Sequence, residues 1–205
     1  MPFDPTGDSA TLVAILRGLQ PACAADTGRV LHAAGVRVIE VPLNSPDPFT
    51  SIASLVAQHE DCLIGAGTVL DEDDVKRTHA AGGRLIVAPN CNPDVIRSAL
   101  DLGMEVMPGI ATPTEAFAAI RAGATKLKLF PAATYGTQFL QALRAVLPAG
   151  IRMYPVGGVG AADVPGWLAA GAAGFGFGSE LFRPEYDLPE VGRRASRLVQ
   201  ALRSR

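Results

Sequence analysis

Two lysines interrupt an apolar stretch in the second half of the chain. Lys126 and Lys128 alternate with leucines in residues 126–131, a stretch that Gly123 precedes and Pro131 ends. This pattern predicts a buried strand on which the two lysines share one face. Burial disfavours the charged ammonium and lowers its pKa, and a neutral amine can attack a carbonyl to form a Schiff base. The alternative is a lysine that extends to the strand end or pairs with a carboxylate.

A glutamate occupies a similar place in an earlier apolar stretch. Residues 36–44 predict another strand, on which Glu40 shares a face with Val38. A carboxylate can move protons while a lysine acts as the nucleophile, so Glu40 and Lys128 together supply the groups that Schiff-base chemistry needs. The alternative is a buried ion pair that holds the fold together, and the two interpretations are compatible.

The elements that must position these side chains follow one repeated order: a helical stretch, a glycine and a strand. Glycine at a helix end can adopt the left-handed conformation that releases the chain into the next strand. About eight strand–helix units result, and their alternation predicts a parallel sheet. We therefore expect one domain over residues 1–205, an α/β fold of the (β/α)8 TIM-barrel class, with residues 1–10 as an N-terminal extension. The glycines of the repeat are Gly35, Gly83, Gly103, Gly123, Gly150 and Gly171.

The competing architecture is an open, doubly wound sheet. In its dinucleotide-binding form, a G-x-G-x-x-G motif follows the first strand. Here the first predicted strand is followed by Arg-Gly-Leu-Gln-Pro at residues 17–21, which does not match that motif. The closed barrel is therefore favoured.

Polar residues stand at several of the predicted strand ends, where barrels of this class carry their chemistry. The first strand ends at Arg17, the third at Thr68 and the fourth at Pro89. The strands that carry Glu40 and Lys128 lie on opposite walls of an eight-stranded barrel. We therefore expect these two side chains to face each other across its mouth.

The last two predicted strands end in glycine-rich stretches. Gly157 and Gly158 follow the seventh strand, and Gly178 and Ser179 end the eighth. The loops after these two strands commonly bind phosphate in this fold class, because backbone N–H groups without a Cβ nearby can approach the anion. The sequence therefore predicts a phosphate site at these four residues.

The bulk composition is that of a soluble protein with a large core: 48% of residues are hydrophobic and the mean hydropathy is +0.24. A net charge of -2 argues against a nucleic-acid partner. No apolar stretch has the length that a membrane span needs, and the first ten residues do not resemble a signal peptide. Three cysteines without C-x-x-C spacing suggest neither a disulfide framework nor a zinc site. We expect a cytoplasmic protein.

The remaining candidates for chemistry are assigned to other roles. His32, His59 and His79 fall in predicted helices or at their ends, away from the strand ends, so we expect no metal site. Lys126 lies two residues before Lys128, about 6–7 Å deeper along the strand, and is assigned to the opposite rim of the barrel. Trp167 lies in a predicted helix and is expected to pack in the core or an interface.

Five short motifs together resemble the class I 2-keto-3-deoxy-6-phosphogluconate and 2-keto-3-deoxy-6-phosphogalactonate aldolase family. The resemblance extends from about residue 12 to the last helix. It implies that Lys128 forms the Schiff base with the substrate keto group, that Glu40 performs the acid–base steps, that no cofactor is needed and that the enzyme is a homotrimer. The motifs are AILRG at residues 14–18, IEVPLNSP at 39–46, GAGTVL at 65–70, KLFPA at 128–132 and VGGV at 156–159.

The sequence departs from the gluconate-type members of that family at two positions. Those members have an arginine four residues after the glutamate and a threonine before the glycine pair, whereas this chain has Asn44 and Val156. These residues match the galactonate type, so the resemblance implies cleavage of 2-keto-3-deoxy-6-phosphogalactonate to pyruvate and glyceraldehyde 3-phosphate. Arg17 is then the cation expected near the substrate carboxylate.

The resemblance also implies that the keto-acid part of the substrate contacts residues at neighbouring strand ends. Beside Arg17, these are Thr68, Pro89 and Phe130. Three other functions stay open. The chain could be a gluconate-type aldolase, a phosphosugar isomerase or epimerase with Glu40 as base, or a non-catalytic phosphosugar-binding barrel.

Overall fold

The computed structural model describes residues 10–203, which form parallel strands and helices in near-perfect alternation. The strands are β1 (Thr11–Ile15), β2 (Val38–Pro42), β3 (Leu63–Gly67), β4 (Leu85–Val87), β5 (Glu105–Met107), β6 (Gly109–Ile110), β7 (Lys126–Leu129), β8 (Arg152–Pro155) and β9 (Gly174–Phe177). The helices are α1 (Pro21–Ala33), α2 (Pro48–Gln58), α3 (Glu72–Ala80), α4 (Pro93–Asp101), α5 (Pro113–Arg121), α6 (Ala132–Arg144), α7 (Val164–Ala169) and α8 (Leu188–Arg203). Of the predicted N-terminal extension, residues 1–9 lie outside the described residues.

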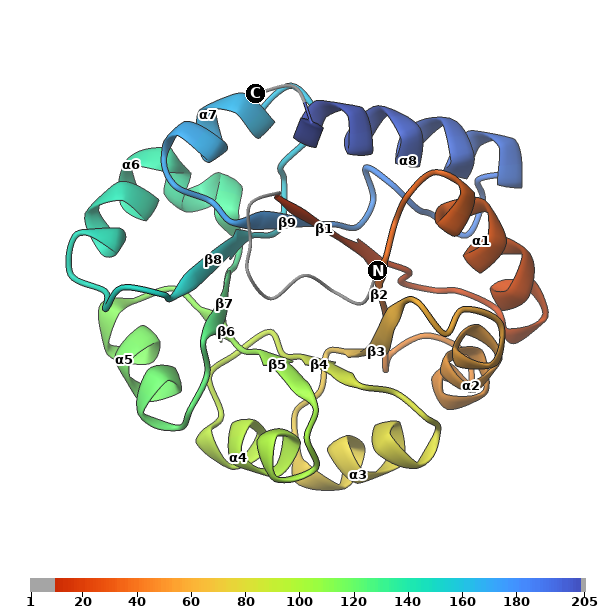
Figure 1. Ribbon diagram of the computed structural model, residues 1–205, viewed down its shortest axis with the longest axis horizontal. Helices are drawn as coiled ribbons and strands as arrows, with labels where there is room; N and C mark the ends of the chain where they lie inside the picture. The colour runs from red at the N-terminus through yellow and green to blue at the C-terminus, as the bar shows by residue number, and fades with distance from the viewer. Residues whose placement is uncertain (1–9, 204–205) are drawn as a thin grey trace.

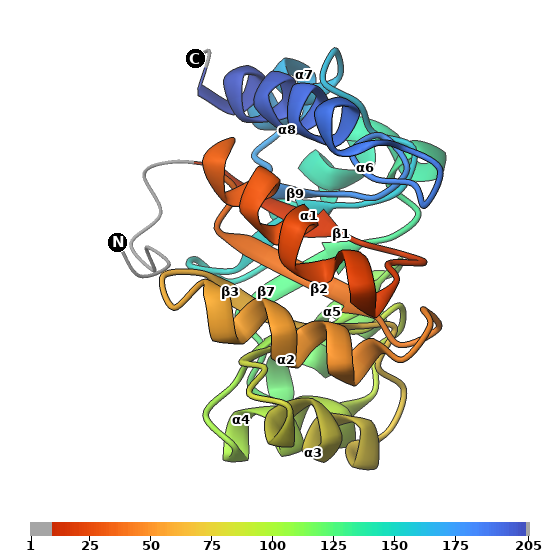
Figure 2. The same cartoon turned by 90° about the vertical axis from the view of Figure 1, so that its right-hand side faces the viewer.

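The strands form two parallel sheets. Six strands follow the order β5-β4-β3-β2-β1-β9 and three follow β6-β7-β8. An isolated parallel bridge between Val156 and Gly176 connects the end of β8 with β9. The helices lie outside the strands (Figure 1), as the view turned by 90° also shows (Figure 2). The predicted α/β class with parallel strands is therefore confirmed.

One extended stretch of the chain is divided into two strands. Residues 105–110 form β5 and β6, with Pro108 between them. Proline has no backbone N–H and therefore cannot donate to a neighbouring strand. Its carbonyl still accepts a hydrogen bond of 2.9 Å from the Lys128 N–H, so the chain passes from the edge of one sheet to the edge of the other.

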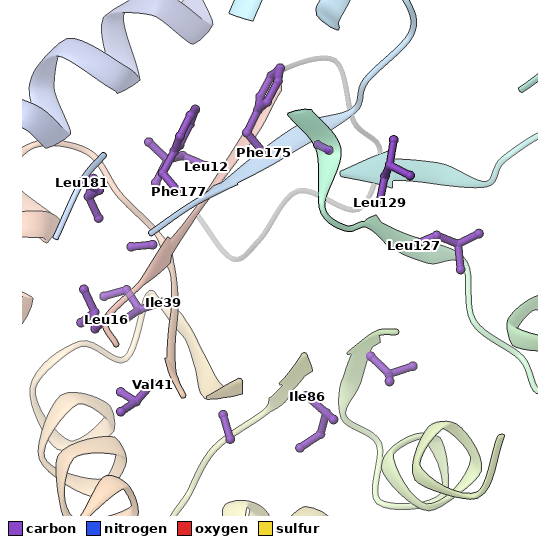
Figure 3. Close-up of a cluster of buried hydrophobic side chains, with 14 of the residues drawn as sticks. Leu12, Leu16, Ile39, Val41, Ile86, Leu127, Leu129, Phe175, Phe177 and Leu181 are labelled. Atoms are coloured by element: carbon purple, nitrogen blue, oxygen red, sulfur yellow. The ribbon is translucent and has the colours of Figure 1, made fainter. Parts of the chain in front are cut away.

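The main core lies between the strands and the surrounding helices (Figure 3). Alternate strand residues supply it: Ile39 and Val41 from β2, and Leu127 and Leu129 from β7, are all fully buried. Period-two alternation places their neighbours on the other face of the strands. Trp167 of α7 also belongs to this core, in agreement with one of its two predicted roles.

A second buried cluster lies on the opposite face of the strands. It joins residues of both sheets: Val13, Val38, Leu85, Val87, Met107 and Tyr154. Lys126 lies on this face and forms an ion pair with Glu105 at the beginning of β5. Lys126 is thus placed at the amino-terminal ends of the strands, where the sequence predicted it.

Helix starts follow the expected capping chemistry. Asp71 caps α3 by accepting a hydrogen bond from the Asp74 N–H, and Thr112 caps α5 by accepting one from the Glu115 N–H. These caps fix where each helix begins after its strand. Within residues 10–203, no helix combines the length and apolar character required to cross a membrane.

Candidate active site

The lysine and glutamate singled out in the sequence are both buried. Glu40, in the middle of β2, is 1% exposed, and Lys128, on β7, is 6% exposed. Backbone pairing fixes their levels: Glu40 is in register with Gly65 of β3, and Lys128 with Tyr154 of β8. The alternation of the sequence thus directs both side chains away from the helix-packed core.

Burial and mutual charge change how these two groups titrate. Burial raises the pKa of Glu40 to about 7, and the positive charges of Lys128 and Arg17 limit the rise. Burial also lowers the pKa of Lys128 below its usual value, which the charge of Glu40 opposes and that of Arg17 reinforces. Among the described residues, Oε2 of Glu40 is buried without a hydrogen-bond partner. The pKa of Glu40 thus lies near neutral pH, and that of Lys128 is lowered.

Gly67, at the end of β3, makes the space that Glu40 occupies. A Cβ added at residue 67 would lie 1.7 Å from Oε2 of Glu40. Any larger residue there would force the carboxylate to move. The sequence places Gly67 in a motif but does not indicate that it leaves space for a carboxylate, because Glu40 lies on a different strand.

A short polar network crosses the ends of the first three strands. The Arg17 guanidinium donates hydrogen bonds to Oδ1 of Asn44 and, at 3.5 Å, to Oγ1 of Thr68. The Gly18 N–H donates to Oγ of Ser45 at 2.9 Å, so the loops after β1 and β2 are held together twice. Thr68 has a φ of 57°, the left-handed region that non-glycine residues adopt rarely and often at functional sites.

A cavity of about 560 Å³ opens at the carboxyl ends of the strands. Its lining contains ten of the twelve residues predicted for the site: Arg17, Thr68, Pro89, Lys128, Phe130, Val156, Gly157, Gly158, Gly178 and Ser179. Glu40 is buried near Lys128 and Arg17, and Asn44 is joined to the lining by its bond from Arg17. The predicted residues are thus brought together at one end of the molecule.

Phe130 forms part of the wall beside the lysine. Nζ of Lys128 lies 4.9 Å from the centre of its ring, and the side chain is 39% exposed, which is unusual for a large apolar residue of the described chain. The ring also packs against Gly157, where an added Cβ would lie 3.2 Å from two ring atoms. An exposed aromatic face beside a buried amine suits a small, partly apolar ligand.

The glycine pair after β8 has backbone geometry that other residues disfavour. Gly157 has a φ of 92° and Gly158 of 72°. A Cβ at residue 158 would lie 2.6 Å from that of Ala133. The N–H of Ala133 donates to the Gly157 carbonyl at 3.0 Å, which ties this turn to the beginning of α6.

Several lining residues were missed in the sequence. Asp163 and Glu180 both line the cavity, and both lie close to Gly160. Asp163 accepts a hydrogen bond of 2.8 Å from the Gly160 N–H, and Glu180 forms an ion pair with Arg197 of α8. Their closeness to the glycine-rich ends could have been a signal, because Glu180 directly follows Ser179. The other lining residues not predicted are Ile15, Val159, Gly160 and Gly176.

The histidines lie away from this cavity. His32 is in α1, His79 is in α3, and His59 follows α2. His32, Asp61 and Cys62 offer possible metal-ligand atoms within 4.8 Å of one another. They precede β2 or β3, at the strand ends opposite the cavity, and Arg37 already pairs with Asp61 at 3.1 Å.

Known proteins resemble the chain over nearly its full length. A "Probable 2-dehydro-3-deoxy-6-phosphogalactonate aldolase" of Rhizobium meliloti (strain 1021) is 48% identical over 90% of this chain and 87% of its own. A 2-dehydro-3-deoxy-6-phosphogalactonate aldolase of Escherichia coli (strain K12) is 45% identical over 94% of each chain. A solved structure described as "Native KDPGal structure" superposes with a TM-score of 0.94 at 42% identity, over 99% of this chain and 98% of that one.

The family profile gives the same assignment. It is described as KDPG and KHG aldolase and matches residues 7–191, most of the chain. The relatives' names and the fold agree with it. With its buried lysine and glutamate beside one cavity, the chain is an aldolase and belongs to the KDPG and KHG aldolase family.

Proposed function

We propose that this aldolase works through a Schiff base at Lys128. The neutral amine attacks the keto carbon of the substrate, and loss of water gives an iminium ion. Cleavage of the C3–C4 bond then sends its electron pair toward the iminium nitrogen, which leaves an enamine and releases the C4 fragment as an aldehyde. Protonation of the enamine at C3 and hydrolysis release pyruvate and return the free amine.

Glu40 is proposed to move the protons of this sequence. Its carboxylate, directly or through a water, takes the proton of the C4 hydroxyl as the bond breaks and later delivers a proton to C3. The observation that carries the proposal is the joint burial of Lys128 and Glu40 in an apolar setting that lowers the pKa of the first and raises that of the second. The lowered pKa of Lys128 favours the neutral amine, and Glu40 can gain and lose a proton near neutral pH.

We infer that the substrate carries an anion at each end. Arg17, held by Asn44 and Thr68, would bind the carboxylate, with Pro89 and Phe130 packing against the keto-acid carbons. The backbone around Gly157, Gly158, Gly178 and Ser179 would bind the phosphate. Two separated anion sites with the lysine between them match a phosphorylated keto acid.

The specific substrate proposed is 2-keto-3-deoxy-6-phosphogalactonate, cleaved to pyruvate and glyceraldehyde 3-phosphate. Relatives that bear the corresponding name are 45–48% identical to this chain. Val156 lines the cavity, and its apolar side chain, unlike that of a threonine, cannot hydrogen-bond a C4 hydroxyl. We therefore place the discrimination between galactonate and gluconate at Val156.

Steady-state rates on both epimers test this substrate assignment. The galactonate should have the higher kcat/KM, and Val156→Thr should move the ratio toward the gluconate by about two- to tenfold, the value of one hydrogen bond. The rate of pyruvate release, followed with a coupled dehydrogenase, gives kcat/KM for each epimer. A wild-type preference for the gluconate, or a ratio that Val156→Thr leaves unchanged, would contradict the assignment.

Three broader features complete the proposal. We propose that β5 and β6 act as one strand and that the two sheets form a closed (β/α)8 barrel, supported by the Val156–Gly176 bridge. A homotrimer is proposed because the family resemblance implies one, and exposed apolar side chains such as Leu70 (50% exposed) and Val146 (57%) are available for contacts. The cytoplasm is the proposed compartment, since the three cysteines are free.

A further inference from the structure

The phosphate end of the cavity is unexpectedly acidic. The positively charged residues in its lining are Arg17 and Lys128, which are assigned to the carboxylate and keto ends of the substrate. Next to the glycine-rich loops, the lining instead holds the carboxylates of Asp163 and Glu180. A phosphate that enters this end would be repelled unless these charges are compensated.

Both carboxylates lie close to Gly160. A Cβ at residue 160 would lie 3.7 Å from Oδ2 of Asp163 and 3.7 Å from Cδ of Glu180. The side chain of Asp163 turns back onto its own loop, where it accepts the Gly160 N–H at 2.8 Å. Glu180 is the one that pairs with a cation.

That cation comes from α8, outside the cavity lining. Arg197 forms an ion pair with Glu180 through its guanidinium. One turn earlier, Nη1 of Arg194 donates a hydrogen bond of 3.0 Å to the backbone carbonyl of Glu180. The last helix therefore holds the residue that follows Ser179 by both its side chain and its backbone.

We propose that Arg197 is a positioning residue for phosphate recognition. It acts through Glu180, by cancelling the charge of that carboxylate and holding it off the phosphate path, so that the N–H groups of the loop can bind the anion. This inference rests on the proposed phosphate site at Gly157, Gly158, Gly178 and Ser179. Arg197 of α8 would therefore influence phosphate binding although it lies outside the cavity lining.

The test compares two arginines of the same helix. Arg197→Ala should raise KM for the phosphorylated substrate by roughly three- to fivefold, as expected for one partly exposed charge pair, and leave kcat near the wild-type value. Arg193→Ala is the matched control: it removes the same charge from α8, but Arg193 pairs with Glu190. The increase should shrink at high ionic strength, because salt screens exposed charges.

A double variant separates charge from structure. Arg197→Ala/Glu180→Gln should return KM close to the wild-type value, because the uncompensated carboxylate is gone. Failure of this rescue, or an equal increase in KM for Arg193→Ala, would overturn the role of Arg197. Inorganic phosphate should be a weaker competitive inhibitor of Arg197→Ala than of the wild type, Arg193→Ala or the double variant.

A parallel measurement distinguishes this inference from the proposed mechanism. Borohydride trapping of pyruvate requires Lys128 and no phosphate, so Arg197→Ala should be trapped as well as the wild type. If Arg197→Ala shows normal trapping and an unchanged KM, only the role of Arg197 is refuted. Absence of trapping in the wild type would refute the Schiff-base mechanism instead.

Discussion

At the scale of residues, the proposed chemistry depends on two ionisable side chains that the fold withdraws from water. An ammonium and a carboxylate are both costly to bury, and each reduces the cost for the other. The net effect leaves the pKa of Glu40 at about 7 and that of Lys128 below its normal value. The charge attraction that makes it less costly to bury these two groups is therefore also what the proposed chemistry uses.

The dependence of rate on pH should report Glu40. Its pKa is raised from 4.5 to about 7, so below pH 7 the carboxyl is increasingly protonated and cannot accept the C4 hydroxyl proton. We expect kcat to fall as the pH decreases through about 7. Glu40→Gln should reduce kcat by about 10²–10⁴-fold and abolish this acid limb. A pH–rate profile of both proteins checks the prediction, and a wild-type kcat that stays level down to about pH 5 would contradict it.

Much of the site can be predicted at this scale, and the exceptions share a cause. Lys128 and Glu40 were identifiable because a charged residue in an alternating apolar strand conflicts with its surroundings. Gly67 and Glu180 were not identified, because their importance depends on side chains from other elements. Periodicity specifies which face a residue takes but not which residue lies opposite it.

At the scale of elements, β3 supplies space and β2 supplies the carboxylate. Gly67→Ala should place a methyl group against Glu40. We expect a destabilisation of about 1–3 kcal/mol from overpacking, and a decrease in kcat greater than this loss of stability alone would cause. Thermal unfolding and steady-state rates measure the two effects.

A glycine elsewhere provides the control for that substitution. A Cβ added at Gly166, in α7, would meet no atom of another element within 4 Å, so Gly166→Ala should leave both stability and rate near their wild-type values. Equal effects of the two substitutions would show that Glu40 does not require the space beside Gly67.

The sequence predicts the order of elements better than their exact extent. Helix caps such as Asp71 and Thr112, and the glycines that end helices, act locally and were recognisable. The division of residues 105–110 into β5 and β6 was not predicted. The Pro108 that interrupts them is visible in the sequence, but the transfer between sheet edges depends on partners from β4 and β7.

At the scale of the whole molecule, the exposed apolar side chains bear on assembly. In residues 139–146, Leu140 and Leu143 are buried in the core, whereas Val146 is 57% exposed. The side chains available for contacts are thus scattered over the surface: Leu70, Leu100, Leu102 and Val146.

The trimer proposal predicts a mass near three times that of the 21.3 kDa chain. Light scattering at micromolar concentration measures it directly. Replacing Leu70 by a charged residue should weaken the assembly if that side chain is buried between subunits, since an interface core disfavours charge. A monomeric mass for the wild type would contradict the proposal.

The central claim is that Lys128 is the nucleophile, and one measurement tests it most directly. The protein is incubated with pyruvate and reduced with borohydride, and the modified lysine is located by peptide mass spectrometry. Lys126→Ala provides the matched control, because it removes a buried lysine from the same face of the same strand. We predict one adduct, on Lys128, that Lys126→Ala retains and Lys128→Ala loses. An adduct on Lys126, or trapping that survives Lys128→Ala, would contradict the mechanism.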